Sequence, residues 1–277
     1  MTTAHVPAST ANLGAGFDVL GMALGLRLAV GDGEPPTRGQ MLDEHHPASV
    51  AFARAGGDDR PLWIRSPIPM GRGLGFSGAA RVAGAALATA IEHRRLDDDG
   101  RRSLLTIAAE LEAHGDNAAA SAFGGVTAWV AGQAVSLPLG SRLGSAEIVA
   151  WIPRSTTSTA RSRATLDPQI DRQAATANLG AVAQFVVALA DDDPDLLAGA
   201  TEDHMHQRAR FAAQPAGLHA LSVGIDAGAW CGWLSGSGPT VALWVDPART
   251  EAVLAALPAG GAARRLTIDT AGVEIEG

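Results

Sequence analysis

The chain of 277 residues contains no lysine, because all 21 of its basic residues are arginine. A nucleotide-binding loop of the Gly-x-x-x-x-Gly-Lys type needs a lysine against the phosphates, and a protein kinase needs one on a strand, so both classes are excluded. Schiff-base and pyridoxal chemistry are excluded too, because each requires an amine side chain. Any phosphate chemistry in this protein therefore proceeds without an ammonium side chain.

Other absences narrow the class of protein further. The single cysteine, Cys231, excludes an internal disulfide and a cysteine-based metal site, and the nearby Trp230 and Trp233 predict a buried thiol. A net charge of −8 argues against a nucleic-acid partner, which would require a basic face. With 47% apolar and 18% charged residues, the composition predicts a globular chain with one large domain or two modest ones.

No stretch of the chain is typical of a targeting or membrane segment. The first residues show no basic region followed by an apolar one, so no signal peptide is expected. Residues 117–141 carry no charge, but Gly, Ser, Gln and Pro interrupt them, which favours two strands over a membrane span. We therefore expect a cytoplasmic protein without a membrane partner.

The most informative stretch is residues 67–80, in which glycines at 71, 73 and 75 precede a run of small residues to about residue 90. The run predicts a helix, and a glycine loop that opens a helix directs unpaired N–H groups and the positive end of the helix dipole at one point. That arrangement suits a phosphate. A glycine-rich turn before a tightly packed helix is the alternative, since a lone glycine motif is weak support for a ligand.

The remaining pattern mixes strands and helices in both halves of the chain, which predicts an α+β fold and not a parallel doubly wound sheet. A Ser/Thr/Arg-rich segment at 153–168 marks the expected boundary region. Strands are expected near residues 5–9, 19–30, 62–68, 126–130, 134–137, 148–152, 230–235, 240–245, 264–269 and 272–276. Helices are expected near residues 49–55, 77–90, 101–113, 171–190, 194–211, 217–228 and 248–257.

Two more glycine-rich stretches, at residues 10–21 and 235–240, accompany the loop, and together the three resemble the motifs of the GHMP kinases. The first, Asn-Leu-Gly-Ala-Gly-Phe-Asp, is similar to the version in homoserine kinases. The loop corresponds to Pro-x-x-x-Gly-Leu-Gly-Ser-Ser-Ala, and Ser-Gly-Ser-Gly-Pro-Thr to the family's third motif. Residues 112–125 resemble the block that homoserine kinases carry between them. Motifs in one order over residues 5–245 make the resemblance specific.

This resemblance implies a two-domain fold of GHMP kinase type. Residues 1–152 would form the ATP-binding domain, which in the family is like ribosomal protein S5 domain 2. Residues 153–277 would form a C-terminal domain that is ferredoxin-like. Relatives in the family are commonly dimers, so a homodimer is one expectation.

The resemblance also assigns residues to ATP and Mg²⁺. The loop would wrap the triphosphate, and the Ser77 hydroxyl and the Glu112 carboxylate would hold the metal, as oxygen donors suit this hard cation. The alternatives are a helix N-cap for Ser77 and a solvated helix position for Glu112. The residues implied in cofactor binding are Pro69, Gly71, Arg72, Gly73, Leu74, Gly75, Phe76, Ser77 and Gly78.

The acceptor implied by the resemblance is L-homoserine, contacted by Asn12 and Asp18. Two arginines, Arg161 and Arg210, would meet its carboxylate, since a guanidinium forms two parallel charge-assisted bonds to a carboxylate. A shift of one or two residues would substitute Arg163 and Arg208.

The block at residues 112–125 supplies the remaining expected contacts. His114 and Asn117 are expected to contact the substrate, and Asn117 is counted with Ser77, Glu112 and Arg161 among the catalytic residues. The role of Asp116 stays open. A metal site formed by His114 and Asp116 is a rival interpretation, but the pair lacks further ligands at suitable spacing.

Two departures from the family pattern bear on function. Phe76 replaces the first serine of the loop motif, and the segment at 47–52 lacks the asparagine that usually helps to hold adenine. The leading hypothesis is an ATP-dependent homoserine kinase that makes O-phospho-L-homoserine for threonine biosynthesis. The alternatives are a GHMP-family kinase of another small hydroxy acid and a non-catalytic binding protein of this fold.

Overall fold

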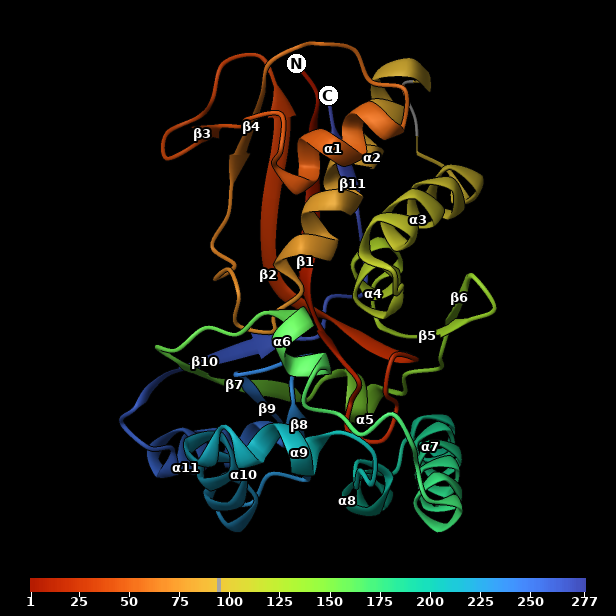
Figure 1. The fold of residues 1–277 in the computed structure, drawn as a ribbon. Coiled ribbons are helices and arrows are strands. Elements are labelled where there is room, and N and C mark those ends of the chain that lie inside the picture. Colours follow the sequence, from red (N-terminus) through yellow and green to blue (C-terminus); the bar gives the residue numbers. More distant parts are fainter. Residues whose placement is uncertain (94–95) are drawn as a thin grey trace.

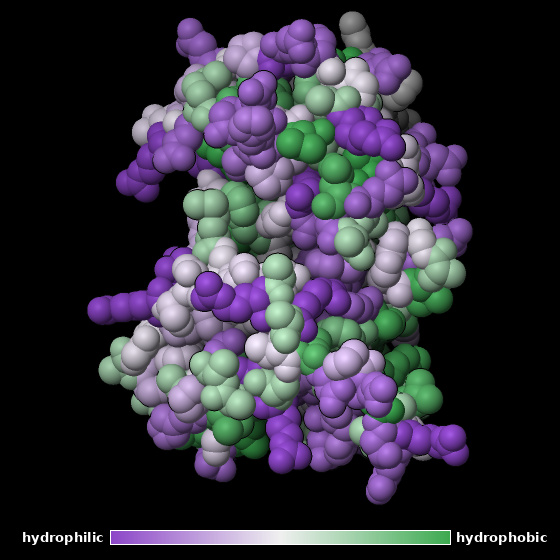
Figure 2. All heavy atoms as spheres, in the orientation of Figure 1, coloured by the Kyte–Doolittle hydropathy of each residue, from purple (hydrophilic) through white to green (hydrophobic). Residues whose placement is uncertain are grey.

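The computed structural model describes residues 1–93 and 96–277. Its strands form two antiparallel sheets, of seven and four strands, which lie in the upper and lower halves of Figure 1. Figure 2 shows that the molecule narrows on one side between these halves. The predicted mixture of helices and antiparallel strands in both halves is therefore confirmed.

The larger sheet has the order β11-β1-β2-β4-β3, with β5 paired to β2 and β6 paired to β5. The single strand β2 runs through the whole predicted region 19–30, pairing with β1 along its length, with β5 at its start and with β4 at its end. The register of β1 shifts between Pro7 and Ala8, where proline has no N–H to donate. The strands of this sheet are β1 (Thr3–Ala11), β2 (Leu20–Asp32), β3 (Gln40–Met41), β4 (Leu62–Arg65), β5 (Val126–Val130), β6 (Gln133–Ser136) and β11 (Glu274–Glu276).

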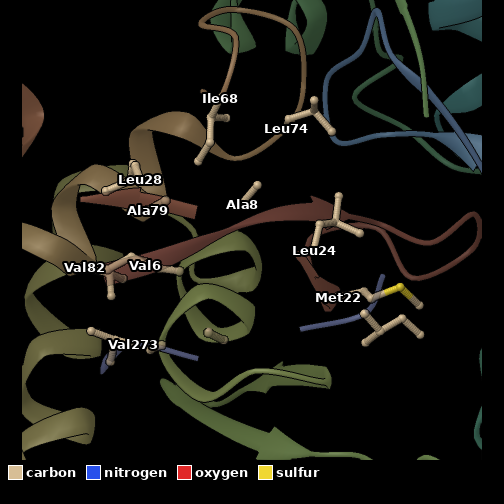
Figure 3. Packing of buried hydrophobic residues seen from close by; sticks show 14 of the residues in the cluster. Val6, Ala8, Met22, Leu24, Leu28, Ile68, Leu74, Ala79, Val82 and Val273 are labelled. Atoms are coloured by element: carbon tan, nitrogen blue, oxygen red, sulfur yellow. The ribbon is translucent and has the colours of Figure 1, made fainter. Parts of the chain in front are cut away.

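Helices α1 (Pro47–Arg54), α2 (Phe76–His93), α3 (Asp98–Glu112) and α4 (Asp116–Phe123) lie beside this sheet (Figure 1). Figure 3 shows Ala79 and Val82 of α2 among Val6 and Leu28 of the first two strands. The small residues of α2 let α1 approach closely, since a Cβ on Gly84 would lie 2.0 Å from the Ala48 carbonyl oxygen. The glycine- and alanine-rich sequence of α2 thus follows from close contact on two sides.

The smaller sheet has the order β10-β7-β9-β8. Its strands are β7 (Glu147–Pro153), β8 (Cys231–Leu234), β9 (Val241–Val245) and β10 (Gly261–Thr267). Helices α10 (Pro215–Asp226) and α11 (Thr250–Ala256) lie against one face of it (Figure 1). The remaining elements are α5 (Ser141–Gly144), α6 (Thr159–Arg163), α7 (Arg172–Asp191), η1 (Pro194–Leu196), α8 (Leu197–Ala200), α9 (Gln207–Ala212) and η2 (Pro247–Arg249).

The sheets do not divide the chain at the expected position between residues 152 and 153. Strand β7 belongs entirely to the smaller sheet, so the change of sheet falls before Glu147. The last strand, β11, returns to pair with β1 in the larger sheet. The buried Val273, just before β11, lies with Val6 and Val82 in the same core (Figure 3).

Two other elements differ from the expected pattern. A continuous helix over 194–211 is wrong: the structure has η1, α8 and α9 there, because the Asp203 carboxylate accepts from the amides of Met205, His206 and Gln207 and starts a new helix. The uncharged region 117–141 contains the two predicted strands, but the alanine-rich α4 precedes them.

One helix of the described residues, α7, is long and apolar enough to cross a membrane by length and composition alone. It also has a structural role within the fold, since its buried Asn178 donates to the Ala15 carbonyl (2.8 Å). That hydrogen bond holds the loop between β1 and β2 against α7. The single thiol, Cys231, is buried as predicted, and burial raises its pKa to about 12.

A buried hydrogen bond joins the two sheets. The indole nitrogen of Trp233 in β8 donates to the Thr10 hydroxyl of β1 (2.8 Å), and the Thr10 hydroxyl oxygen lies 2.8 Å from that of Ser235. The adjacent Trp244 is equally buried, yet its indole nitrogen has no hydrogen-bond partner among the described residues.

This difference predicts the outcome of two matched substitutions. Both Trp233→Phe and Trp244→Phe remove similar buried volume, but only the first breaks a hydrogen bond. We expect Trp233→Phe to lower the free energy of unfolding by about 1–2 kcal/mol more than Trp244→Phe, measured by urea denaturation. Equal losses for the two variants would show that the bond between the sheets contributes nothing.

Candidate active site

A pocket lies between the two sheets, where the loop between β4 and α2 meets the segment before α6. The Thr157 amide donates to the Gly71 carbonyl there (2.9 Å). The lining of the pocket brings together all three glycine-rich stretches and the block after α3. The pocket is lined by Asn12, Asp18, Pro69, residues 71–78, Glu112, His114, Asp116, Asn117, Thr157, Thr159, Arg163, Arg210 and residues 236–238.

The loop backbone requires its glycines. Gly71, Gly73 and Gly75 have φ values of 66°, 76° and 65°, a region that side chains disfavour. A Cβ on Gly73 would lie 2.2 Å from the Ser235 carbonyl oxygen, and one on Gly75 would lie 2.0 Å from the Ser9 hydroxyl. The glycines therefore let the loop fit closely between β1 and the turn after β8.

The amides that this loop presents have no hydrogen-bond partner among the residues that the structure describes. Over the part of the chain that the structure describes, none of the N–H groups of residues 72–78 donates a hydrogen bond. The next amide, that of Ala79, donates to the Gly75 carbonyl as the first turn of α2 forms. A row of free donors at the N-terminus of an 18-residue helix is a site for an anion of high charge.

Contacts from the smaller sheet hold the loop in place. The Arg72 guanidinium donates to the carbonyls of Pro153 (3.3 Å), Met70 (3.1 Å) and Arg154 (3.1 Å), so its side chain is bound to the end of β7. The Ser235 hydroxyl donates to the Gly73 carbonyl (2.5 Å). The backbone amide of Arg72, and not its guanidinium, therefore fits the expected role in cofactor binding.

The Phe76 ring is partly buried, packs against the hydrophobic core and lines the pocket. It meets the ring of His46, at the start of α1, edge to face with the centroids 6.0 Å apart. The bulky residue in place of serine is thus accommodated against α1, and the neighbouring amides remain free.

Ser77 and Glu112 come together as the resemblance implies, with the Ser77 hydroxyl donating to the carboxylate (2.5 Å). These oxygens are suitable donors for a hard divalent cation that takes its other ligands from phosphates. A third side chain shares the pair: the Arg81 guanidinium contacts both the carboxylate and the hydroxyl. Burial lowers the pKa of Arg81 because desolvation disfavours the charged guanidinium. Arg81 was not expected here, although it is the only charged residue between Arg72 and Glu92.

The acceptor end of the pocket contains opposite charges. Arg163 donates to the Asp18 carboxylate (2.6 Å), and the guanidinium carbons of Arg163 and Arg210 lie 5.6 and 5.3 Å from the centroid of the Phe17 ring. Arg161, by contrast, is exposed and does not line the pocket, because the short helix α6 turns its side chain to solvent. The arginine of α6 that pairs with Asp18 is therefore Arg163, two residues after Arg161. Phe17 was not singled out from the sequence, although it lies inside the first motif.

A buried network fixes Arg210. Its guanidinium donates to the Gly236 carbonyl and to Nδ1 of His206, at 3.0 and 3.1 Å, and Asn12 donates to the same carbonyl. His206 therefore holds its proton on Nε2, which donates to the Gly14 carbonyl (2.9 Å). Burial lowers the pKa of His206 and lowers that of Arg210 to about 10, so at neutral pH the histidine is neutral and the arginine charged.

The third group of predicted residues lies at the start of α4. The buried Asp116 accepts from the Asn117 amide (2.8 Å) and lies 3.1 Å from Nδ1 of His114, while Ser9 donates to the Asn117 side-chain oxygen (3.0 Å). No group of three or more histidine, cysteine or acidic residues among the described ones could hold a metal ion. The rival metal site at His114 and Asp116 is thus unsupported within that part of the chain.

Comparisons with known proteins show which family the chain resembles. Residues 44–125 match the GHMP kinases N terminal domain. A homoserine kinase from Thermus thermophilus is 34% identical over 270 residues, which span 92% of this chain and 90% of that protein. One from Streptomyces avermitilis is 36% identical, spanning 98% of this chain and 94% of the relative.

Solved structures show the same fold at lower identity. A homoserine kinase from Cytophaga hutchinsonii superposes with a TM-score of 0.84 at 24% identity, covering 99% of this chain and 97% of that one. A mevalonate kinase from Methanococcus jannaschii gives 0.71 at 12% identity, covering 96% and 98%. The expected fold is confirmed, and from the identities over nearly its whole length the chain belongs to the GHMP kinase family.

Proposed function

We propose that this protein is a homoserine kinase, which transfers the γ-phosphoryl group of ATP to the side-chain hydroxyl of L-homoserine. The observation that carries the proposal is the juxtaposition in one pocket of the free amides of residues 72–78 with the charged cluster of Asp18, Arg163 and Arg210. The first suits a triphosphate and the second a zwitterion. The names of the relatives support the same activity. A cytoplasmic enzyme fits this chemistry, because both substrates are soluble metabolites.

The nucleotide end is built mainly from backbone. The amides of residues 72–78 would bind phosphate oxygens, and Ser77 and Glu112 would hold Mg²⁺. The metal supplies neutralisation of the charge that develops as the phosphoryl group is transferred. Because phosphoryl transfer depends on positioning and charge more than on covalent steps, a loop without lysine can meet the requirement.

The acceptor end matches an amino acid. An ammonium group would pair with Asp18, and a carboxylate would pair with Arg163 and Arg210, whose guanidiniums are already oriented over Phe17. We infer that Arg163, and not Arg161, fills this role. Asn12 contributes by fixing the loop, since its side-chain oxygen accepts from the Asp18 amide (3.1 Å).

His114 and Asn117 would lie beside the reacting hydroxyl. The hydroxyl oxygen bonds to the γ-phosphorus as the bond to the bridging oxygen of ADP breaks, and its proton passes to the transferred phosphoryl group. Asp116 is occupied by His114 and the Asn117 amide, so it positions these two residues. No step requires it to accept a proton.

The experiment that tests the function is ADP release measured with L-homoserine, mevalonate, galactose and shikimate as acceptors. We expect L-homoserine to give the highest kcat/KM. If only another alcohol stimulates ADP release, the protein is a kinase but its acceptor is not L-homoserine. If no acceptor stimulates ADP release, calorimetric titration with Mg-ATP distinguishes a nucleotide-binding protein from one that has lost nucleotide binding.

Removing the charge of Glu112 should lower turnover strongly, and thermal unfolding shows whether the variant still folds once the Arg81 charge is left uncompensated. We expect Glu112→Gln to lower kcat by about 100-fold or more, because the metal loses its carboxylate ligand. The matched control is Glu110→Gln in the same helix, where the exposed Glu110 pairs with Arg54 on the surface (3.2 Å). Near-wild-type turnover of Glu112→Gln would remove Glu112 from the metal site.

The two arginines of α6 provide a second matched pair. Arg163→Ala should raise the KM for homoserine by about 10- to 100-fold, the effect of losing a hydrogen bond to a charged group. Arg161→Ala should leave it within about twofold, since its side chain is exposed outside the pocket. Initial rates over a range of homoserine concentrations decide between them, and the reverse order would contradict the assignment of Arg163.

A further inference from the structure

Arg81 occupies a position that the reaction described so far does not explain. It lies on α2 one turn after Ser77, and its guanidinium contacts the Ser77 hydroxyl and the Glu112 carboxylate together. The side chains of Arg81 and Glu112 are 19% and 13% exposed, so the pair is largely removed from water. The Nε atom of Arg81 is buried without a hydrogen-bond partner among the residues that the structure describes.

The oxygens that Arg81 contacts are the same ones proposed to hold the metal. A guanidinium and a divalent cation cannot both lie against the Glu112 Oε1 atom and the Ser77 hydroxyl, because the two positive charges repel strongly at such separations in a half-buried site. Glu112 ends α3, so without a cation its carboxylate would lie unpaired beside the phosphates. Arg81 supplies that cation from within the protein.

We propose that Arg81 is a tethered cation that exchanges with the divalent metal at Ser77 and Glu112. In the nucleotide-free protein the guanidinium neutralises Glu112 and keeps α2 and α3 together. When metal enters, it takes the two oxygens and the arginine side chain is released. Arg81 thereby lowers the affinity of the empty site for metal, so that metal binds with the triphosphate and not before it. This inference rests on the metal site of the proposed function.

The test is titration of the full chain with Mn²⁺ in the absence of nucleotide, followed by the electron paramagnetic resonance signal of free Mn²⁺. Arg81→Met keeps the aliphatic stem and removes the charge. We expect it to bind Mn²⁺ at least about tenfold more tightly than wild type, a change of about 1.4 kcal/mol. Arg81→Lys keeps the charge and should stay close to wild type.

The matched control is Arg54→Ala, which breaks the exposed pair between α1 and α3 and should leave Mn²⁺ affinity unchanged. Thermal unfolding shows which variants fold. A purely structural role for Arg81 would lower the melting temperature of Arg81→Met without tightening Mn²⁺, and unchanged or weaker binding overturns the exchange.

Failure of the inference and failure of the function are separable. If neither wild type nor Arg81→Met binds Mn²⁺ without nucleotide, the exchange is overturned, whereas the metal pair, which takes its other ligands from phosphates, is tested by the turnover of Glu112→Gln. Homoserine-dependent ADP release by wild type is measured independently, and its absence overturns the proposed function whatever the Mn²⁺ titration shows.

Discussion

Between β4 and α2 the described backbone leaves the amides of residues 72–78 without partners. These amides line the pocket at the N-terminus of α2, where N–H groups and the positive end of the helix dipole favour an anion. The rest of the molecule is arranged to hold this row open. Ser9 and the turn after β8 press on the loop glycines from the two sheets, and Arg72 ties the loop to the end of β7.

Both sheets are needed for the site because each contributes one half of it. The larger sheet carries the loop, the end of α3 and the start of α4, whereas the smaller sheet and its helices contribute Arg163, Arg210 and the turn at residues 236–238. The buried bond from Trp233 to Thr10 and the return of β11 to β1 fix the sheets relative to one another. Positioning to a fraction of an ångström, on which phosphoryl transfer depends, is a property of this junction.

Much of this could be predicted from the sequence, because glycine motifs and hydrophobic periodicity are local. The loop and most elements fall in this class, whereas the pairing of Ser77 with Glu112 follows only from the resemblance to the GHMP kinases. The rest depends on contacts between distant segments. Which arginine of α6 faces the pocket is decided by the orientation of one short helix. The positive charge beside Glu112 comes from Arg81, which the sequence pattern places within a helix without indicating a function. Arg81 reaches Glu112 only because α3 packs against α2.

We propose that backbone amides, and not a side-chain ammonium, bind the triphosphate. Nuclear magnetic resonance of the ¹⁵N-labelled protein can follow each amide as a non-hydrolysable ATP analogue and Mg²⁺ are added. We expect the amide resonances of residues 72–78 to move the most and to do so together, saturating at one nucleotide per chain. If those resonances stay in place while amides elsewhere respond, the phosphate site lies elsewhere and the loop does not bind the nucleotide.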